Sequence, residues 1–89
     1  MKCYIISYDL NNASPERYQL LQDSIKSLGA WAHINLSVWA VITSSPASSI
    51  RDLLKAKVGA TDSIFVVKSG TEAAWSNVIC SNEWLKNNL

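Results

Sequence analysis

The stretch KCYIISYDL, residues 2–10, predicts the strand around which the fold is built. Apolar residues predominate from Cys3 to Tyr8 without polar alternation, which is typical of a strand buried on both faces of a sheet. The run ends at Asp9. One carboxylate is therefore expected at the C-terminal end of a central strand.

Two helices are predicted, with the same start and stop signals. Ser14-Pro15 opens the first and Ser45-Pro46 the second, because Ser caps a helix N-terminus and Pro suits the first turn. Gly29 and Gly59 are expected to end them. Apolar residues recur at helical spacing in both, which indicates one buried face on each helix. The positions expected on these faces are Tyr18, Leu20, Leu21, Ile25 and Leu28 in the first helix and Ala47, Ile50, Leu53, Leu54 and Val58 in the second.

The remaining β-rich segments complete the predicted fold. The segment 31–43 divides near Asn35–Ser37 into strands at 31–34 and 38–43, which we expect to form a hairpin, and 62–68 is a last strand. The order strand, helix, strand, strand, helix, strand is the ferredoxin-like βαββαβ plan. This α+β fold has two helices on one face of a four-stranded antiparallel sheet, with the first and third strands in the centre.

A single domain is expected over residues 1–89, with a core at 1–70 and a Trp-rich C-terminal extension at 71–89. The extension is too apolar to be a loose end. We expect a short helix at 82–89, and either a fifth strand or a helical turn at 76–80. In a monomer the extension would cover the open sheet face, and in a dimer it would reach the sheet edge of the partner.

Composition narrows the classes of partner. The net charge is +1, which disfavours sequence-independent binding to a polyanion but leaves room for a local basic patch. Four Trp in so short a chain favour a homodimer, since large aromatic residues complete either a core or an interface. Cys3 and Cys80 lack CxxC spacing and no signal segment follows Met1, so we expect reduced thiols and a cytoplasmic location. No apolar run is long enough to span a membrane, and nothing predicts haem or flavin.

Asp9 is the first candidate for chemistry. It either accepts backbone N–H bonds in the following loop, or acts together with the Asp9 of a second copy. Two carboxylates brought close need a cation, and Mg²⁺ binds readily through one or two carboxylates and water. His33 is the only histidine, and its place beside Trp31 favours packing or hydrogen bonding over general-base catalysis.

Basic residues offer a second candidate site. Arg51 and Lys55 lie one helical turn apart, where they would contact phosphates or remain solvated on the helix surface. The motifs of a nucleophile elbow, a zinc site and a phosphate-binding glycine loop do not occur in this sequence.

Several short motifs together resemble the small CRISPR-associated protein two family. They are an apolar strand ending in Tyr8-Asp9-Leu10, a capped helix ending in Leu28-Gly29, and NLSVW at 35–39 leading into the third strand. The virulence-associated protein D toxins share the same broad plan. The resemblance covers residues 1–70 and implies a ferredoxin-like homodimer, with an Asp near the twofold axis.

The resemblance also implies a function. It points to a Mg²⁺-dependent endoribonuclease or to a subunit of CRISPR adaptation, with Asp9 as catalytic residue and metal ligand. Tyr8 matches the tyrosine-aspartate pair of the family and Ser37 its Ser-Val-aromatic step, so both are implied as binding residues. The chain departs from the family because it lacks a basic run after Asp9 and carries the extension. It more nearly resembles small relatives in bacteria and their phages.

Two classes of function are therefore expected. The first is a homodimeric nucleic-acid-associated protein that acts as a metal-dependent endonuclease or phosphodiesterase. The alternative is a scaffold without catalysis, which presents Lys and Arg to nucleic acid or to a protein partner. A nucleotide-binding module, with the ligand held between aromatic side chains such as Trp39 and Trp75, is a further form of this alternative.

Overall fold

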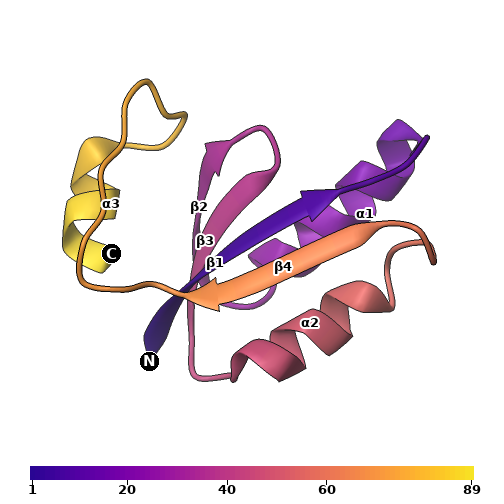
Figure 1. The fold of residues 1–89 in the computed structure, drawn as a ribbon, viewed down its shortest axis with the longest axis horizontal. Helices are drawn as coiled ribbons and strands as arrows, with labels where there is room; N and C mark the ends of the chain where they lie inside the picture. Colours follow the sequence, from indigo (N-terminus) through magenta and orange to yellow (C-terminus); the bar gives the residue numbers. More distant parts are fainter.

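A computed structural model describes all residues, 1–89, as four strands and three helices. The strands and helices are packed in layers, as Figure 1 shows. In chain order they are β1 (Lys2–Asp9), α1 (Pro15–Lys26), β2 (Ala30–Asn35), β3 (Val38–Thr43), α2 (Ala47–Lys55), β4 (Ser63–Lys68) and α3 (Asn82–Asn88).

The four strands form one antiparallel sheet in the order β2-β3-β1-β4. The α+β class and the central positions of the first and third strands are therefore confirmed. β1 is buried on the face towards α1 and α2, whereas on its other face Cys3 is buried, Ile5 and Ser7 are half-buried and Asp9 is exposed, so the predicted burial on both faces holds only in part. The hairpin between β2 and β3 is also confirmed, with Leu36 and Ser37 as its two-residue connection.

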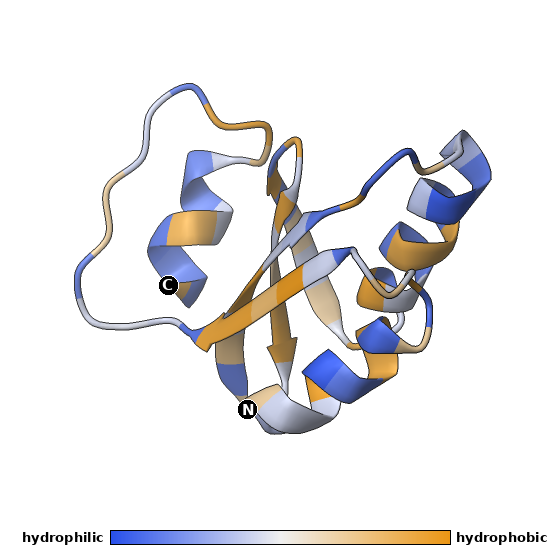
Figure 2. Cartoon of the chain, turned by 45° about the vertical axis from the view of Figure 1, so that its right-hand side comes forward, coloured by the Kyte–Doolittle hydropathy of each residue, from blue (hydrophilic) through white to orange (hydrophobic).

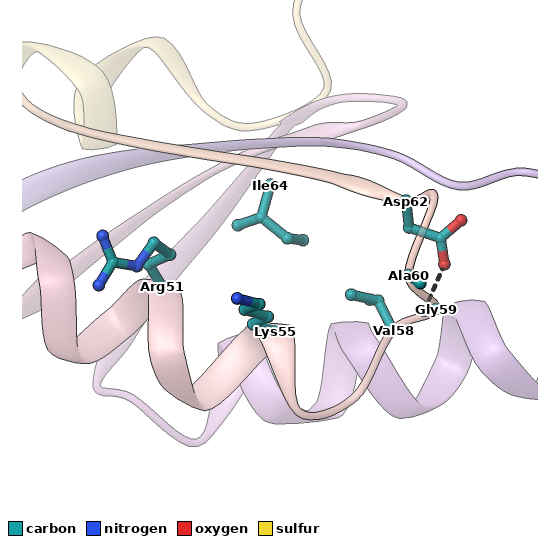
Figure 3. Close-up of a pocket in the computed structure, with 7 residues that line it drawn as sticks. All are labelled: Arg51, Lys55, Val58, Gly59, Ala60, Asp62 and Ile64. Carbon is teal, nitrogen blue, oxygen red and sulfur yellow. Dashed lines mark hydrogen bonds between the residues drawn. The ribbon is translucent and has the colours of Figure 1, made fainter.

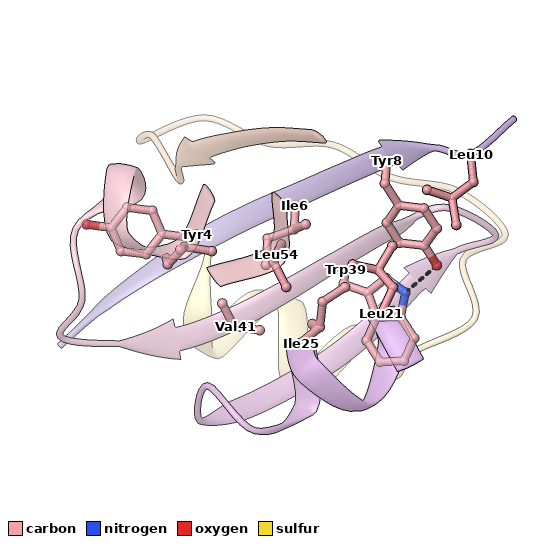
Figure 4. Close-up of a cluster of buried hydrophobic side chains, with 10 residues drawn as sticks. Tyr4, Ile6, Tyr8, Leu10, Leu21, Ile25, Trp39, Val41 and Leu54 are labelled. Carbon is pink, nitrogen blue, oxygen red and sulfur yellow. Dashed lines mark hydrogen bonds between the residues drawn. The ribbon is translucent and has the colours of Figure 1, made fainter. Parts of the chain in front are cut away.

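One face of the sheet is covered by α1 and α2, and the main core lies between this face and the two helices. Tyr4, Ile6 and Tyr8 point to this side from β1, because alternate residues of a strand share a face. The core consists of ten buried residues, most of which Figure 4 labels: Tyr4, Ile6, Tyr8, Leu10, Leu21, Ile25, Trp39, Val41, Ile50 and Leu54.

The opposite face is covered in part by α3, which lies across the sheet from α1 and α2 (Figure 2). Leu85 is the buried residue of this short helix and is only 1% exposed. Cys3 and Ala40 are buried on the same face of the sheet, although neither belongs to the main core. The predicted helix of the extension is thus confirmed, and it packs on its own sheet.

Three details of the predicted helices are wrong. α2 begins at Ala47 with Pro46 as its N-cap, and no side chain caps it, whereas Ser14 caps α1 by accepting a hydrogen bond from the Arg17 N–H at 3.3 Å. Leu53 is partly exposed, because the narrower buried stripe of α2 is formed by Ile50 and Leu54. Leu20 is likewise partly exposed on α1.

Neither glycine is the residue at which its helix ends, since α1 ends at Lys26 and α2 at Lys55. Gly29 has a positive φ of 157° and passes against the backbone carbonyl of Ile42, where a Cβ atom would collide. The glycine is therefore required by the close approach of β2 to β3 and not by a helix cap.

Residues 76–80 form neither the fifth strand nor the helical turn that the sequence suggests. They contact the sheet through one backbone hydrogen bond, from the Ile79 N–H to the Ile34 carbonyl of β2 at 2.8 Å. None of the three helices has the length and apolar character needed to cross a membrane.

Candidate functional site

Asp9 lies at the end of β1, exposed, on the face of the sheet that faces away from α1 and α2. Its side chain accepts no hydrogen bond, so the predicted loop-capping role is not observed. Directly paired residues of antiparallel strands share a face, so Asp9 is on the same side as Phe65 and Val67 of β4. These two apolar side chains are 62% and 42% exposed. An uncovered apolar strip therefore lies beside the carboxylate.

Asp9 belongs to no cluster of metal-ligating side chains inside one chain. Nowhere do three His, Cys, Asp or Glu side chains gather in a way that could hold a metal ion. The residues of a single chain therefore do not fit Mg²⁺, since one exposed carboxylate is too few ligands for a firm site.

Tyr8 points to the other side of the sheet and is buried in the main core. Its hydroxyl oxygen accepts a hydrogen bond from the Trp39 Nε1–H at 3.2 Å (Figure 4) and another from the Gln22 side-chain amide at 3.4 Å. The adjacent residues Tyr8 and Asp9 thus lie on opposite faces of the sheet. The Tyr8 hydroxyl provides a hydrogen-bond acceptor for the indole N–H of the buried Trp39.

Ser37 lies in the turn between β2 and β3. Its backbone carbonyl accepts a hydrogen bond from the Tyr8 N–H at 3.1 Å, which extends the pairing of β1 and β3 by one step. This contact places Ser37 beside the end of β1, whereas Arg51 and Lys55 lie on α2. The sequence-predicted site residues therefore fall into two groups.

His33 packs flat against Trp39, with ring centroids 4.1 Å apart and an interplanar angle of 12°. Its Nε2–H donates a hydrogen bond to the Leu36 carbonyl at 3.2 Å. The amine of Lys26 lies over the Trp31 ring, 4.9 Å from its centroid. His33 thus packs and hydrogen-bonds, as its place in the sequence suggests.

Arg51 and Lys55 are brought together in a groove between α2 and β4. The groove has a volume of about 310 Å³, and its apolar wall includes Val58 and Ile64 (Figure 3). Arg51 forms an ion pair with its neighbour Asp52 at 3.0 Å, and both side chains are more than half exposed. Such an exposed pair contributes little to stability and only weakly neutralises the charge of Arg51.

A second hollow continues the groove along β4. Its volume is about 420 Å³, and Arg51 and Ile64 line both hollows. Phe65 and Val66 also line the second hollow. The groove is therefore a continuous surface with two cations on the helix side and an apolar strand on the other.

Asp62 at the end of the groove is the residue that sequence reasoning missed. The sequence predicts it as the first residue of the last strand, but β4 begins at Ser63. The Asp62 carboxylate accepts hydrogen bonds from the Asn11 N–H at 2.8 Å and the Gly59 N–H at 2.7 Å and forms an ion pair with Arg17. The backbone bonds from Asn11 and Gly59, together with Arg17, lower the pKa of this carboxyl below its ordinary value. Asp62 is thereby occupied, and its side chain is 1% exposed.

The role of Asp62 explains its place in the sequence. Its three donors come from the loop after β1, from α1 and from the segment after α2, so one carboxylate ties three connections together. A Gly-x-x-Asp spacing before a predicted strand is the only local signal, because Asn11 and Arg17 lie far away in sequence.

Cys3 and Cys80 are both free thiols. Burial raises the pKa of the Cys3 thiol above its ordinary value. Cys80 is less deeply buried and lies in the extension. A buried thiol with a raised pKa has little thiolate at neutral pH and is poorly reactive.

Comparisons with known proteins add no relative to this picture. No protein-family model matches the sequence, and no curated protein is significantly similar to it.

Proposed function

We propose that the protein is a homodimeric, nucleic-acid-associated protein with the ferredoxin-like plan of the CRISPR-associated protein two family. The observation that carries this proposal is the exposed apolar strip of Phe65 and Val67 beside Asp9. A second copy packed on this strip would remove both side chains from water and bring two Asp9 carboxylates towards a twofold axis.

The sheet order supports the ferredoxin-like part of the proposal. β1 and β3 are central, and α1 and α2 lie on one face. The uncovered part of the other face runs along β1 and β4, which is where a partner sheet would pack. The two free thiols fit a reducing compartment, so we place the protein in the cytoplasm.

Catalysis would depend on the dimer, because the residues of one chain do not form a metal site. Two Asp9 carboxylates close together cannot both stay ionised without a cation, and Mg²⁺ is the ion we propose for them. The protein would then be an endoribonuclease or phosphodiesterase. Asp9, the one catalytic residue that the sequence predicts, is exposed on this face.

The test is a pair of variants that separate dimerisation from chemistry. Phe65→Ser should convert the dimer to a monomer, measured by light scattering after size exclusion. Asp9→Asn should leave the dimer intact and abolish both Mg²⁺ binding, measured by calorimetry, and cleavage of RNA and DNA. Asp23→Asn is the matched control on α1, where the carboxylate accepts a hydrogen bond from the Gln19 side chain.

Two results would reject the proposal. One is a wild-type protein that is monomeric at all concentrations. The other is cleavage by carefully purified protein that survives Asp9→Asn, which would show that the active carboxylate lies elsewhere.

The second candidate function is a scaffold without catalysis, and the groove that joins Arg51 and Lys55 favours it. In its nucleic-acid form, two phosphate contacts to a single strand predict that log K falls with log salt concentration with a slope of about −1.4. A steeper slope would require more cations than this groove contains. Absence of binding at low ionic strength would exclude the nucleic-acid form.

A further inference from the structure

The two edges of the sheet differ in how they are protected. β2 carries a register irregularity between His33 and Asn35, and Ile79 of the extension bonds to the Ile34 carbonyl. A bulge and a covering segment are two of the devices by which natural proteins block edge pairing. β2 is therefore closed to a further strand.

β4 at the other edge has none of these devices. It is a regular strand, SIFVVK, without Pro or bulge, and its single charge lies at its last residue, Lys68. The Ser69 N–H donates to the Cys3 carbonyl at 2.8 Å, so these two residues are a hydrogen-bonded pair of the β1–β4 ladder. In an antiparallel ladder every second residue pair is hydrogen-bonded, so the bonded residues of β4 are Ser63, Phe65 and Val67. Ile64 and Val66 must therefore direct their N–H and C=O groups away from β1.

The groove lies along this open edge. Ile64 and Val66 line its hollows from the strand, while Arg51 and Lys55 approach from α2. Figure 3 shows both cationic side chains extending from α2 on the helix side of the groove, with Ile64 on the strand opposite; Lys55 lies below Ile64, and the Arg51 guanidinium points away from it along the groove. A strand added to β4 would place every second side chain in this groove, because alternate residues of a strand share a face.

The spacing of the two helix positions that carry the cations matches such a strand. Four residues of helix separate Arg51 and Lys55, a rise of about 6 Å. Two residues of a strand span about 6.6 to 6.8 Å. Carboxylates at positions i and i+2 of an added strand would therefore meet the two cations in turn.

We propose that the edge of β4 and the α2–β4 groove bind an extended acidic segment of a protein partner, with the pattern acid-x-acid, by strand addition. The inference rests on the scaffold form of the proposed function and names its partner. Main-chain hydrogen bonds to Ile64 and Val66 hold the segment, and ion pairs with Arg51 and Lys55 select it.

Charge decides between this partner and the other two classes. A second copy could offer its own β4, but that strand carries no carboxylate, and Asp62 is already occupied by its three donors. A nucleic acid would satisfy the cations, but its phosphates have no donor for the outward carbonyl groups of β4. An acidic peptide strand satisfies the cations, the N–H groups and the carbonyls together.

The test uses two synthetic peptides of equal composition. Acetyl-TVEVEVT-amide carries both carboxylates on one face of a strand, and acetyl-TVEEVVT-amide carries them on opposite faces. We expect the first to bind up to about fivefold more tightly, because the second peptide still places one carboxylate in the groove and the difference is one partly exposed ion pair. The first peptide should also shift the amide NMR signals of Ile64 and Val66. Binding is measured by fluorescence anisotropy of labelled peptides.

Three variants define the site. Arg51→Gln combined with Lys55→Gln should remove the preference between the peptides, while Lys86→Gln on α3 should not. Val66→Pro removes an outward N–H but no bond to β1, so it should abolish binding of both peptides. Its fold is checked by circular dichroism, and peptides N-methylated at the residues that face β4 test the same bonds if this variant does not fold.

Several outcomes would overturn the proposal. Equal binding of the two peptides would remove the spacing argument, and binding that survives Val66→Pro in a folded protein would remove strand addition. Self-association that Val66→Pro abolishes, without peptide binding, would assign the edge to a second copy. An oligonucleotide that shifts the Ile64 and Val66 amides when neither peptide does would assign the groove to phosphate. None of these tests changes Asp9 or Phe65, and Phe65 lines only the second hollow of the groove, so the dimer proposal is tested separately by Asp9→Asn and by the oligomeric state of the wild type.

Discussion

Truncating Leu85 to alanine tests whether the C-terminal extension is part of the folded domain. This side chain is 1% exposed and is the buried residue of α3. Removing a buried leucine in this way costs about 2 to 5 kcal/mol. We expect the lower part of that range, about 2 to 3 kcal/mol, because a short terminal helix can undock locally before the domain unfolds.

The assay is urea unfolding followed by circular dichroism, with thermal melts as a second probe. A loss of 2 to 3 kcal/mol in a domain of this size lowers Tm by on the order of 10 to 20 °C. Leu36→Ala is the matched control, since that leucine is 82% exposed at the β2–β3 turn. The control should stay within about 0.5 kcal/mol of wild type.

Equal stabilities of the two variants would refute this reasoning. Such a result would mean that α3 does not rest on the sheet in solution, and that the face containing Cys3 and Ala40 is open. Hydrogen exchange of β1 in the Leu85→Ala variant would locate the change, because loss of α3 should expose that face first.

Three further predictions concern the connections and the thiols. Asp62→Asn should lower the free energy of unfolding measured with urea at pH 7. Because the pKa of Asp62 is depressed in the folded protein, the wild type should be the more stable of the two above about pH 4. This difference should disappear as the pH falls through the folded pKa. Gly29→Ala should cost about 1 to 3 kcal/mol in the same assay by forcing a Cβ against a backbone carbonyl, whereas Gly70→Ala, which meets nothing within 4 Å, should be close to neutral. Iodoacetamide should label Cys80 well before Cys3 in the native protein, as read by peptide mass mapping, and equal rates would show that the burial of Cys3 is not maintained.

The strands could be predicted from the sequence because a central strand carries apolar residues at adjacent positions, which leaves a direct mark. In β1 and β3 polar alternation is missing, and both strands are central. Helix ends were predicted less well. Gly29 follows an apolar helix and resembles a cap, but its conformation is required by a neighbouring strand that lies thirteen residues further along the chain.

The candidate site could be predicted only in part, because some of its residues that are in contact lie far apart in the sequence. The pairing of Arg51 with Lys55 follows from helical spacing, and the structure brings them into one groove. Tyr8 and Asp9 are neighbours in sequence but lie on opposite faces, as any two adjacent strand residues must. Two of the three contacts of Asp62 come from residues 45 and 51 positions away, so the local Gly-x-x-Asp spacing could indicate only the contact with Gly59.

The central position of β1 also has a consequence for synthesis. This strand leaves the ribosome before its two partners, β3 and β4, which are completed only at Thr43 and Lys68. At 5 to 20 residues per second, the sheet around it cannot close for about 3 to 13 s. During that interval a segment with apolar side chains on both faces remains uncovered, so the nascent chain is most open to chaperones and to aggregation at the stretch KCYIISYDL.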